Sequence, residues 1–434
     1  MKRASRLLNI PPYPFARWAE HVANARRQGA DQNPSVDVIR LDVGNPDTPP
    51  PDEVIETLCQ SAHQPDHHGY FSYRGLPALR EAIAAYYERR FGVVLDPDTE
   101  VLPLIGSKEG IVNMALACLD PGDLALVPDP GYAPYAMGAA LAGAEVYAFP
   151  LLAERGFLPD LNAIPADVAD RAILMWLNYP NNPTGATADA DEKHPVDGPD
   201  STRPLFPAQY PADEKHPVGK KHPVTFFARA VDFARQHGLF LCHDAPYCDV
   251  TYDGYVAPSI LQVPGASEVA VEFNSLSKTF NMAGWRVGMA VGNADALAAL
   301  AQVKSNVDSG LFRPLQEAAI RALSASPEWI SARNRVYEQR LEIILAGLNA
   351  AGMPAARPRA ALYVWARVPT EWNSEEFALA LLKQTGVALA PGSFFGATGA
   401  GYVRISVTAP SARIRTAMDR LCQFARSPAI SQDT

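Results

Sequence analysis

The sequence lacks paired cysteines, an excess of basic charge and long apolar runs, and each absence excludes a class of protein. The five cysteines form no C-x-x-C pair and no cysteine–histidine pattern with metal-ligand spacing, so we expect reduced, mostly buried thiols. A net charge of −9 disfavours nucleic acid, which needs a basic face. No stretch approaches the roughly 18 apolar residues of a membrane helix, and Met1–Pro14 lacks the apolar core of a signal peptide. We therefore expect a cytoplasmic protein without nucleic-acid or membrane partners.

What the sequence does contain is an alternation of short apolar runs with helical patterns. Its 434 residues, 48% of them hydrophobic and 20% charged, are enough for two domains. The expected buried strands are Val101–Ile105, Leu124–Val127, Ile173–Leu177, Leu239–Cys242, Val269–Phe273 and Val287–Val291. The expected helices between them include Pro77–Phe91, Gly110–Leu119 and Phe226–His237. This alternation is typical of an α/β domain with a mainly parallel sheet, which binds ligands beyond the carboxyl ends of its strands.

The pattern changes after about Asp308. A long helical pattern at Ser331–Ala351 precedes strand-like runs at Ala361–Ala366 and Tyr402–Val407, which favours a smaller α+β domain. The first residues have no sheet partner nearby and are expected to pack with that domain. We therefore expect an N-terminal segment (1–48), a large domain (49–308) and a small C-terminal domain (309–434).

Residues 189–224 stand apart because they are polar and rich in proline. Ala-Asp-Glu-Lys-His-Pro-Val occurs there twice and Lys-His-Pro-Val once more. The prolines preclude a long helix, so we expect an inserted surface loop. His194, His216 and His222 are not at the spacing of a standard metal site, so no metal is predicted, and a contact with another subunit fits the segment better.

A lysine directly after a buried run is the centre of the predicted site. Lys278 follows Val269–Phe273, where partial desolvation lowers its pKa and makes the amine a nucleophile toward carbonyl groups. Ser275 and Ser277 supply hydroxyls beside it, and Arg286 supplies a planar fork that suits phosphate. Together these groups suit a phosphorylated aldehyde. The S-x-x-K pattern also occurs in serine acyl-enzymes, but their S-D-N and K-T-G motifs are absent.

Two further strand ends carry groups that suit a pyridine ring. Asp244 follows a buried run, and a carboxylate there keeps a ring nitrogen protonated, as pyridoxal phosphate requires to act as an electron sink. Tyr247, and Asn182 in an Asn-Pro-Thr-Gly turn, can each donate a hydrogen bond to the phenolic oxygen of that ring. His243, beside Asp244, is interpreted as a structural neighbour.

Three other positions complete the candidate site. Ser107 and the backbone of Lys108 begin a helix, where N–H groups and a hydroxyl bind an anion without a Walker motif. Tyr132 follows a buried run and can stack on the ring. Arg404 lies within an apolar strand and needs an anionic partner, which in an amino-acid enzyme is the substrate carboxylate. Each motif alone also fits a structural role, such as a turn, a core aromatic or a buried salt bridge, so the prediction depends on the set.

The ordered set resembles the aspartate aminotransferase family, fold type I of the pyridoxal-phosphate enzymes. The resemblance extends from Pro11 to Phe424, apart from residues 189–224. It implies a mainly parallel seven-stranded sheet between helices, a smaller α+β domain, and pyridoxal 5′-phosphate as cofactor. It also implies the transfer of an amino group between an L-amino acid and a 2-oxo acid, with 2-oxoglutarate and glutamate as one pair.

The resemblance also implies a role for each predicted residue. Lys278 forms an imine with the cofactor and moves the proton between the substrate α-carbon and the cofactor. Asp244 pairs with the pyridine nitrogen, Asn182 and Tyr247 bind the phenolic oxygen, and Tyr132 stacks on the ring. The residues that hold the phosphate are Ser107, Lys108 through its backbone, Ser275, Ser277 and Arg286.

The substrate site and the assembly follow from the same resemblance. Arg404 binds the substrate carboxylate, and Tyr70 matches a tyrosine that reaches the phosphate in the partner subunit, which implies a homodimer with shared active sites. Within the family, P-P-Y-P-F, L-D-V-G-N-P and V-K-S-N-V-D-S-G are most similar to LL-diaminopimelate aminotransferases and their near relatives. That likeness adds Tyr13, Gly44 and Asn306 to the substrate site.

The same residues are also compatible with other functions. A pyridoxal-phosphate lyase of this fold needs the same set, so only its products separate it from an aminotransferase. A regulator would carry a helix-turn-helix extension, for which the residues before Leu41 are too few, and the negative charge disfavours DNA. The substrate stays open, because a dicarboxylic substrate usually needs a second arginine that spacing does not locate.

Overall fold

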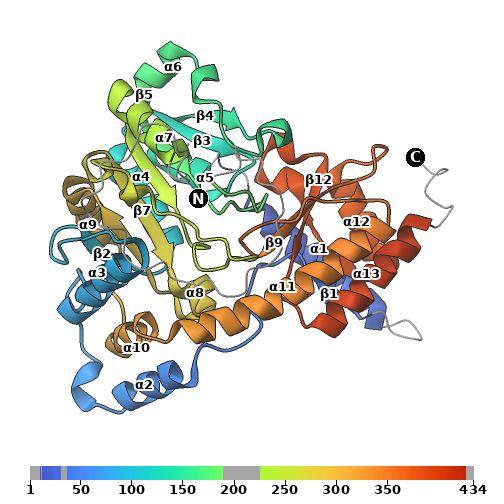
Figure 1. Cartoon of the computed structure of the whole chain (residues 1–434), viewed down its shortest axis with the longest axis horizontal. Coiled ribbons are helices and arrows are strands. Elements are labelled where there is room, and N and C mark those ends of the chain that lie inside the picture. The colour runs from blue at the N-terminus through green and yellow to red at the C-terminus, as the bar shows by residue number, and fades with distance from the viewer. Residues whose placement is uncertain (1–9, 11, 31–36, 189–224, 427–434) are drawn as a thin grey trace, which may run out of the picture.

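A seven-stranded sheet is the largest element of the computed structural model, which describes residues 10, 12–30, 37–188 and 225–426 (Figure 1). The strand order is β2-β8-β7-β6-β5-β3-β4. The bounds are β2 Val101–Leu104, β3 Leu124–Asp129, β4 Glu145–Pro150, β5 Ala172–Leu177, β6 Phe240–Asp244, β7 Ala270–Ser275 and β8 Gly288–Gly292. Strand β8 is antiparallel to both neighbours, and the other pairs are parallel. The predicted α/β fold class with a mainly parallel seven-stranded sheet is confirmed.

Burial on both faces explains why the sequence located most of these strands. In β5, Leu174 and Trp176 pack into one apolar cluster, whereas Met175 and Leu177 pack into another on the opposite face. Such strands appear in a sequence as continuous apolar runs. Strand β4 is an edge strand with mostly exposed residues, so it has no such run and was not predicted.

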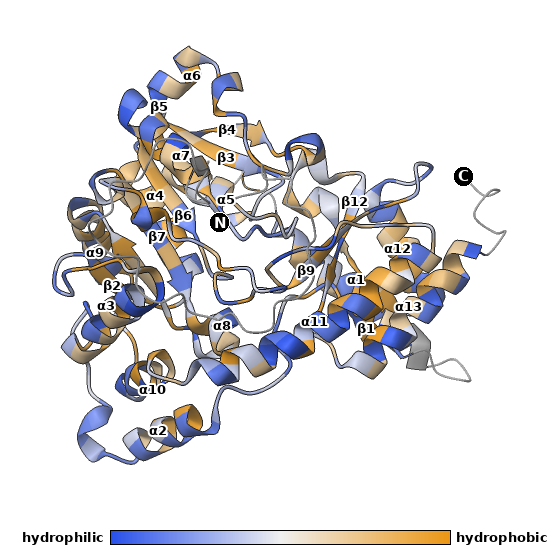
Figure 2. Ribbon diagram, in the orientation of Figure 1, coloured by the Kyte–Doolittle hydropathy of each residue, from blue (hydrophilic) through white to orange (hydrophobic). Residues whose placement is uncertain are grey.

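Helices cover both faces of the sheet, and Figure 2 shows the apolar strands enclosed between them. The bounds are α2 Asp52–Ala62, α3 Pro77–Phe91, α4 Ser107–Cys118, α5 Pro134–Ala142, α6 Ala166–Arg171, α7 Thr225–His237, α8 Leu276–Thr279, α9 Ala294–Val307 and α10 Arg313–Leu323. Helices α4, α5 and α9 contribute to the cluster that contains Trp176, and α7 contributes to the cluster on the other face. The three helices predicted between the strands are present, and α4 begins slightly earlier than expected, at Ser107.

The N-terminal and C-terminal residues form a second part with its own sheets. Its elements are α1 Pro14–Ala30, β1 Ile39–Arg40, α11 Pro327–Ala350, β9 Tyr363–Arg367, α12 Ser374–Thr385, β10 Val387–Ala388, β11 Ala390–Pro391, β12 Tyr402–Ser406 and α13 Ser411–Arg426. Strand β1 pairs with β10, and β12 lies between β9 and β11. Trp18 and Val22 of α1 share an apolar cluster with Leu421 of α13. The N-terminal residues therefore pack against the C-terminal ones.

Helix α11 joins the two parts (Figure 1). Ile330, near its start, belongs to the apolar cluster beside β2 and β8, whereas Tyr337, Leu341 and Leu348 belong to the cluster of the second part. Short 3-10 turns complete the chain: η2 Pro65–His67, η3 Ala153–Arg155, η4 Leu161–Ala163, η5 Ile260–Gln262, η6 Ala266–Glu268, η7 Ala283–Trp285, η8 Gly392–Phe395 and η9 Ala397–Gly399.

Three sequence expectations concern other regions of the chain. The 189–224 segment, with His194, His216 and His222, lies outside the described residues. All five cysteines are unbonded, but only Cys242 and Cys248 are buried, so the expectation of mostly buried thiols is only partly met. Within the described ranges, no helix combines the length and apolarity needed to cross a membrane.

Candidate active site

The carboxyl ends of β5, β6 and β7 meet the start of α4 around a cavity of about 380 Å³. This is the edge where a parallel sheet is expected to bind its ligand. Most of the predicted site residues line the cavity: Tyr13, Gly44, Ser107, Lys108, Tyr132, Asn182, Asp244, Tyr247, Ser275, Ser277, Lys278, Arg286 and Arg404. Of the predicted site residues, only Tyr70 and Asn306 lie elsewhere.

Lys278 lies in the short helix α8, directly after β7. Its Nζ donates a hydrogen bond to the carbonyl oxygen of Gly44 at 2.5 Å. Burial, reinforced by the positive charges of Arg404 and Arg286, lowers the pKa of Lys278 to about 8. The neutral amine, which is the form that attacks a carbonyl carbon, is therefore accessible near neutral pH.

Asp244 ends strand β6 with one carboxylate oxygen satisfied and one not. The hydroxyl of Tyr135 donates to Oδ2 at 2.7 Å, whereas the buried Oδ1 has no partner. Burial raises the pKa of Asp244 to about 7, although the hydrogen bond from Tyr135 opposes the rise. A buried carboxylate oxygen without a donor is costly, and a protonated ring nitrogen in the cavity would supply the missing donor.

A group of anion-binding residues, called the anion cradle below, lies beside Lys278 and Asp244 at the first turn of α4. Ser275 donates to Ser277 at 2.8 Å, and Arg286 donates through Nη1 to the carbonyl of Ala283 at 2.8 Å. Gly106 precedes α4, and a Cβ added there would lie 2.1 Å from Nη2 of Arg286. Hydroxyls, a guanidinium group and the backbone N–H groups of a helix start form a donor set suited to phosphate. The cavity thus fits a phosphorylated pyridine.

Arg404 projects from β12 into the opposite side of the cavity. It donates through Nη1 to Oδ1 of Asn182 and through Nη2 to the carbonyl of Asp42, both at 2.7 Å, while its buried Nε has no partner. The rings of Tyr363 and Phe395 lie 4.0 and 4.7 Å from its Cζ. The hydrogen bonds of the described residues give this cation only neutral acceptors, so its charge is left for a ligand anion.

Tyr363 is the main site residue that the sequence analysis missed. Its hydroxyl lies 3.0 Å from that of Tyr247, and a Cβ added to Gly44 would lie 2.0 Å from it. Gly44 is therefore needed for the close approach of Tyr363. The signal was hidden because Tyr363 belongs to an apolar strand, where an aromatic residue reads as core. Tyr135, the partner of Asp244, was missed for the same reason on α5.

Lys108 contributes more than the backbone that the sequence suggested. Its Nζ lies 4.5 Å from the centre of the Tyr13 ring, a cation–π contact. Burial and the charge of Arg286 lower the pKa of Lys108, and burial raises the pKa of Tyr13. The side chain thus adds a further cationic group to the cavity, besides Arg286 and Arg404. His243 does not line it, as the interpretation of this residue as a structural neighbour requires.

Tyr70 and Asn306 lie outside this cavity. Tyr70 is 91% exposed, and Asn306 is an exposed residue of α9 that donates to the carbonyl of Gln302 at 2.9 Å. Neither contributes to the cavity of its own chain.

Comparison with known proteins agrees with the cavity. The chain matches the family described as aminotransferase class I and II over residues 36–196 and 215–421. It is 47% identical to the LL-diaminopimelate aminotransferase of Moorella thermoacetica, covering 97% of this chain and 98% of that protein. The corresponding protein of Dehalococcoides mccartyi strain 195 is 45% identical, with 98% and 99% covered.

Solved structures show the same architecture. Substrate-bound BacF from Bacillus subtilis is 34% identical, with a TM-score of 0.85 and 98% of each chain covered. An aspartate aminotransferase mutant of Thermus thermophilus is 27% identical, with a TM-score of 0.82 and coverage of 98% and 99%. The fold and cavity are those of a pyridoxal-phosphate enzyme of fold type I. The chain belongs to the class I and II aminotransferases and transfers amino groups with pyridoxal phosphate as cofactor.

Proposed function

We propose that this aminotransferase takes LL-diaminopimelate as its amino donor and 2-oxoglutarate as its acceptor. The observation that carries the proposal is near full-length likeness to relatives named LL-diaminopimelate aminotransferase, at 41–47% identity. The cavity supports it, because Arg404 and Lys108 offer cations to two carboxylates and LL-diaminopimelate has one at each end. Lys108 thereby fills the place of the second arginine that the sequence did not locate.

In this proposal the chain holds the cofactor with the residues that line the cavity. Asp244 binds the ring nitrogen through its unpartnered Oδ1, and Tyr132 packs on the ring. Asn182 and Tyr247 bind the phenolic oxygen; since Oδ1 of Asn182 already accepts from Arg404, its amide nitrogen remains to donate. The phosphate is held by Ser107, the Lys108 backbone, Ser275, Ser277 and Arg286.

When bound, pyridoxal phosphate supplies an electron sink for the charge left by a departing α-proton. Lys278 supplies the base: its Nζ takes that proton in its neutral form, which a pKa of about 8 keeps available. Arg404 fixes the substrate carboxylate, so that the α-carbon faces Nζ. Gly44 accepts the hydrogen bond that now orients the amine.

We also propose a homodimer in which Tyr70 and Asn306 serve the partner's cavity. The segment of Tyr70 carries exposed aromatic rings, with Phe71 at 50% exposure. It lies beside the segment that follows α9, because Phe312 is 5.8 Å from the ring of His68. Contiguous exposed apolar side chains mark an interface. We further propose that the chain is divided into an N-terminal segment (1–48), a large domain (49–308) and a small domain (309–434), and that the protein is cytoplasmic.

A donor panel tests the substrate. Purified enzyme with pyridoxal phosphate and 2-oxoglutarate is given LL-diaminopimelate, aspartate or an aromatic amino acid, and glutamate is measured. We expect the highest kcat/KM for LL-diaminopimelate and no turnover with Lys278→Ala. A higher kcat/KM for another donor would refute the substrate. Release of pyruvate and ammonia without glutamate would favour a lyase.

A further inference from the structure

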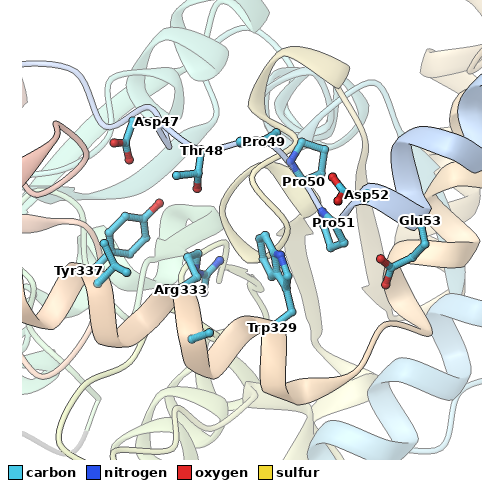
Figure 3. A pocket seen from close by; sticks show the side chains of 12 residues that line it. Asp47, Thr48, Pro49, Pro50, Pro51, Asp52, Glu53, Trp329, Arg333 and Tyr337 are labelled. Atoms are coloured by element: carbon cyan, nitrogen blue, oxygen red, sulfur yellow. The ribbon is translucent and has the colours of Figure 1, made fainter.

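A second pocket of about 470 Å³ lies outside the active-site cavity (Figure 3). It is bounded by the segment from Asp47 to Glu53 and by the first half of α11, with Trp329, Arg333 and Tyr337 on the helix side. None of its lining residues also lines the active-site cavity. The two cavities share no lining residue, and Arg333 is the lining side chain that donates hydrogen bonds to α8.

All five N–H groups of the Arg333 guanidinium have acceptors. Nη1 donates to the carbonyl of Lys278 and to that of Thr279, the latter at 2.5 Å. Nη2 donates to the carbonyl of Asp249 at 2.8 Å and to Oδ1 of Asn334 at 2.6 Å, and Nε donates to the same Oδ1 at 3.1 Å. The planar fork therefore fixes two consecutive carbonyls of the turn that carries the site lysine.

The cost of this arrangement indicates that it is specific. Arg333 is 6% exposed, and its hydrogen-bond acceptors are all uncharged oxygens. Burying a cation without an anion is unfavourable, and burial lowers the pKa of Arg333. This cost is offset at the end of α8. Because α8 is a single turn, the carbonyls at its end have no partners within the helix, and Arg333 satisfies them.

Because Arg333 lies on α11, its contact with α8 can also affect how Lys278 is aligned with the second part of the molecule. Helix α11 joins the two parts of the molecule, and Arg404 and Gly44, on the second part, face Lys278 across the cavity. We propose that Arg333 is a positioning residue that holds the backbone of Lys278, so that its amine stays aligned with the groups on the second part. This inference rests on the role of Lys278 in the proposed function.

The experiment compares Arg333→Lys and Arg333→Ala with Arg340→Ala. Arg340 is a matched control, since it is buried on the same helix but donates to Asp47 and Val407 instead of the Lys278 turn. In cofactor-free protein, trace acetylation of Lys278 is followed by mass spectrometry across pH, and thermal unfolding is recorded. In cofactor-loaded protein, kcat and KM are measured, and borohydride trapping shows whether the cofactor attaches to Lys278.

Both Arg333 variants are expected to raise the midpoint pH of Lys278 labelling, because the amine moves away from the partly buried position in which its pKa is lowered. We expect kcat to fall by about 10–100-fold, the scale of a misplacement of about 1 Å, while KM for the amino donor changes less than about twofold. Methylguanidinium is expected to restore part of the kcat of Arg333→Ala, because the open pocket leads to the vacated site. It should not affect Arg340→Ala, whose labelling midpoint stays that of the wild type.

The remaining outcomes are also decisive. If the wild type traps no cofactor on Lys278, the proposed function fails, and this inference fails with it. If the wild type traps the cofactor but the Arg333 variants lose only thermal stability, with unchanged labelling midpoint and kcat, the inference alone is overturned. Should Arg333→Ala prove insoluble, Arg333→Lys decides by its labelling midpoint, since a lysine keeps the charge but cannot reach all the acceptors.

Discussion

The amine of Lys278 is charged in the unfolded chain, but in the folded protein it occupies a site that disfavours the charge. Its pKa falls from the ordinary value of 10.5 to about 8 through burial and two guanidinium groups. At pH values below about 8 both states are protonated, and the folded state bears the full penalty. Between about 8 and 10.5 the unfolded chain binds more protons, so stability rises with pH. The residue best suited to the chemistry therefore destabilises the cofactor-free fold.

Replacing this lysine should stabilise the cofactor-free enzyme. Lys278→Met keeps the length of the side chain but removes the charge. We expect unfolding in urea at pH 7 to require on the order of 2 kcal/mol more than for the wild type, and we expect this gain to disappear by about pH 10.5. Equal or lower stability of the variant at pH 7 would contradict the assigned burial of the charge.

At the scale of elements, the turn into α4 is specified by a glycine. Gly106 has φ +74°, and a Cβ there would meet the Arg286 guanidinium; Gly92, after α3, has φ +67° with open space around its Cβ position. Both glycines have a positive φ, but Gly92 is left-handed helical with ψ 20°, whereas Gly106 has ψ 153°, a region that is almost restricted to glycine. Comparing their alanine variants therefore distinguishes backbone strain from disruption of the anion cradle.

We expect Gly92→Ala to lose about 1 kcal/mol of unfolding free energy, the cost of a left-handed non-glycine residue, and Gly106→Ala to lose about 2–3 kcal/mol, because its backbone conformation is almost restricted to glycine. Only Gly106→Ala should weaken cofactor binding, by at least about tenfold, because Arg286 is displaced. Equilibrium titration of the cofactor-free variants with pyridoxal phosphate, alongside urea unfolding, checks both. Equal cofactor affinity in the two variants would remove Arg286 from the phosphate site.

Strands β6 and β7 are joined by a buried carboxylate. The fully buried Glu272 accepts hydrogen bonds from Tyr87, Ser259 and the Ile260 N–H at 2.8–3.0 Å, and its Oε2 lies 2.9 Å from Nδ1 of His243. On its other side, Nε2 of His243 lies 3.0 Å from the carbonyl oxygen of Tyr179; a carbonyl can only accept, so Nε2 carries a hydrogen. The three donors come from α3 and from the start of η5, so the Glu272 side chain ties these segments to β7.

Glu272→Gln should therefore cost about 3 kcal/mol of unfolding free energy, since it turns an acceptor into a donor and leaves buried partners unsatisfied. Glu268→Gln, which breaks an exposed ion pair with Arg235, should cost less than about 1 kcal/mol. Urea unfolding measures both. A similar, small loss in the two variants would show that the buried hydrogen bonds of Glu272 contribute little to stability.

These elements also show what a sequence can and cannot predict. Strands β5, β6 and β7 were found because burial on both faces leaves apolar runs, and Asn182, Asp244 and Lys278 were found because parallel strands end at one edge. Edge strand β4 was missed because its exposed residues break the pattern. Tyr363 and Arg333 were missed because contacts between segments far apart in sequence leave no local signal.

At the scale of the whole molecule, α11 and the N-terminal residues connect two apolar cores around one cavity. The cavity contains groups from both parts, with Lys278 on one and Arg404 on the other. In the proposed dimer, a second copy contributes its Tyr70 to this cavity, because Tyr70 is exposed to solvent in the single chain. If two copies share their sites, a defect in one subunit can be repaired by the other.

Mixing two inactive variants tests this sharing directly. Tyr70→Ala removes the residue proposed to act in the partner's cavity, and Lys278→Ala removes one that acts in its own. After unfolding and refolding together, half of the dimers pair one of each, and one of the two cavities in such a dimer has both residues. We expect about a quarter of wild-type activity, by the arithmetic of random pairing in a two-fold dimer. Each variant refolded alone should stay inactive, and a mixture no more active than its parts would place Tyr70 outside a shared site.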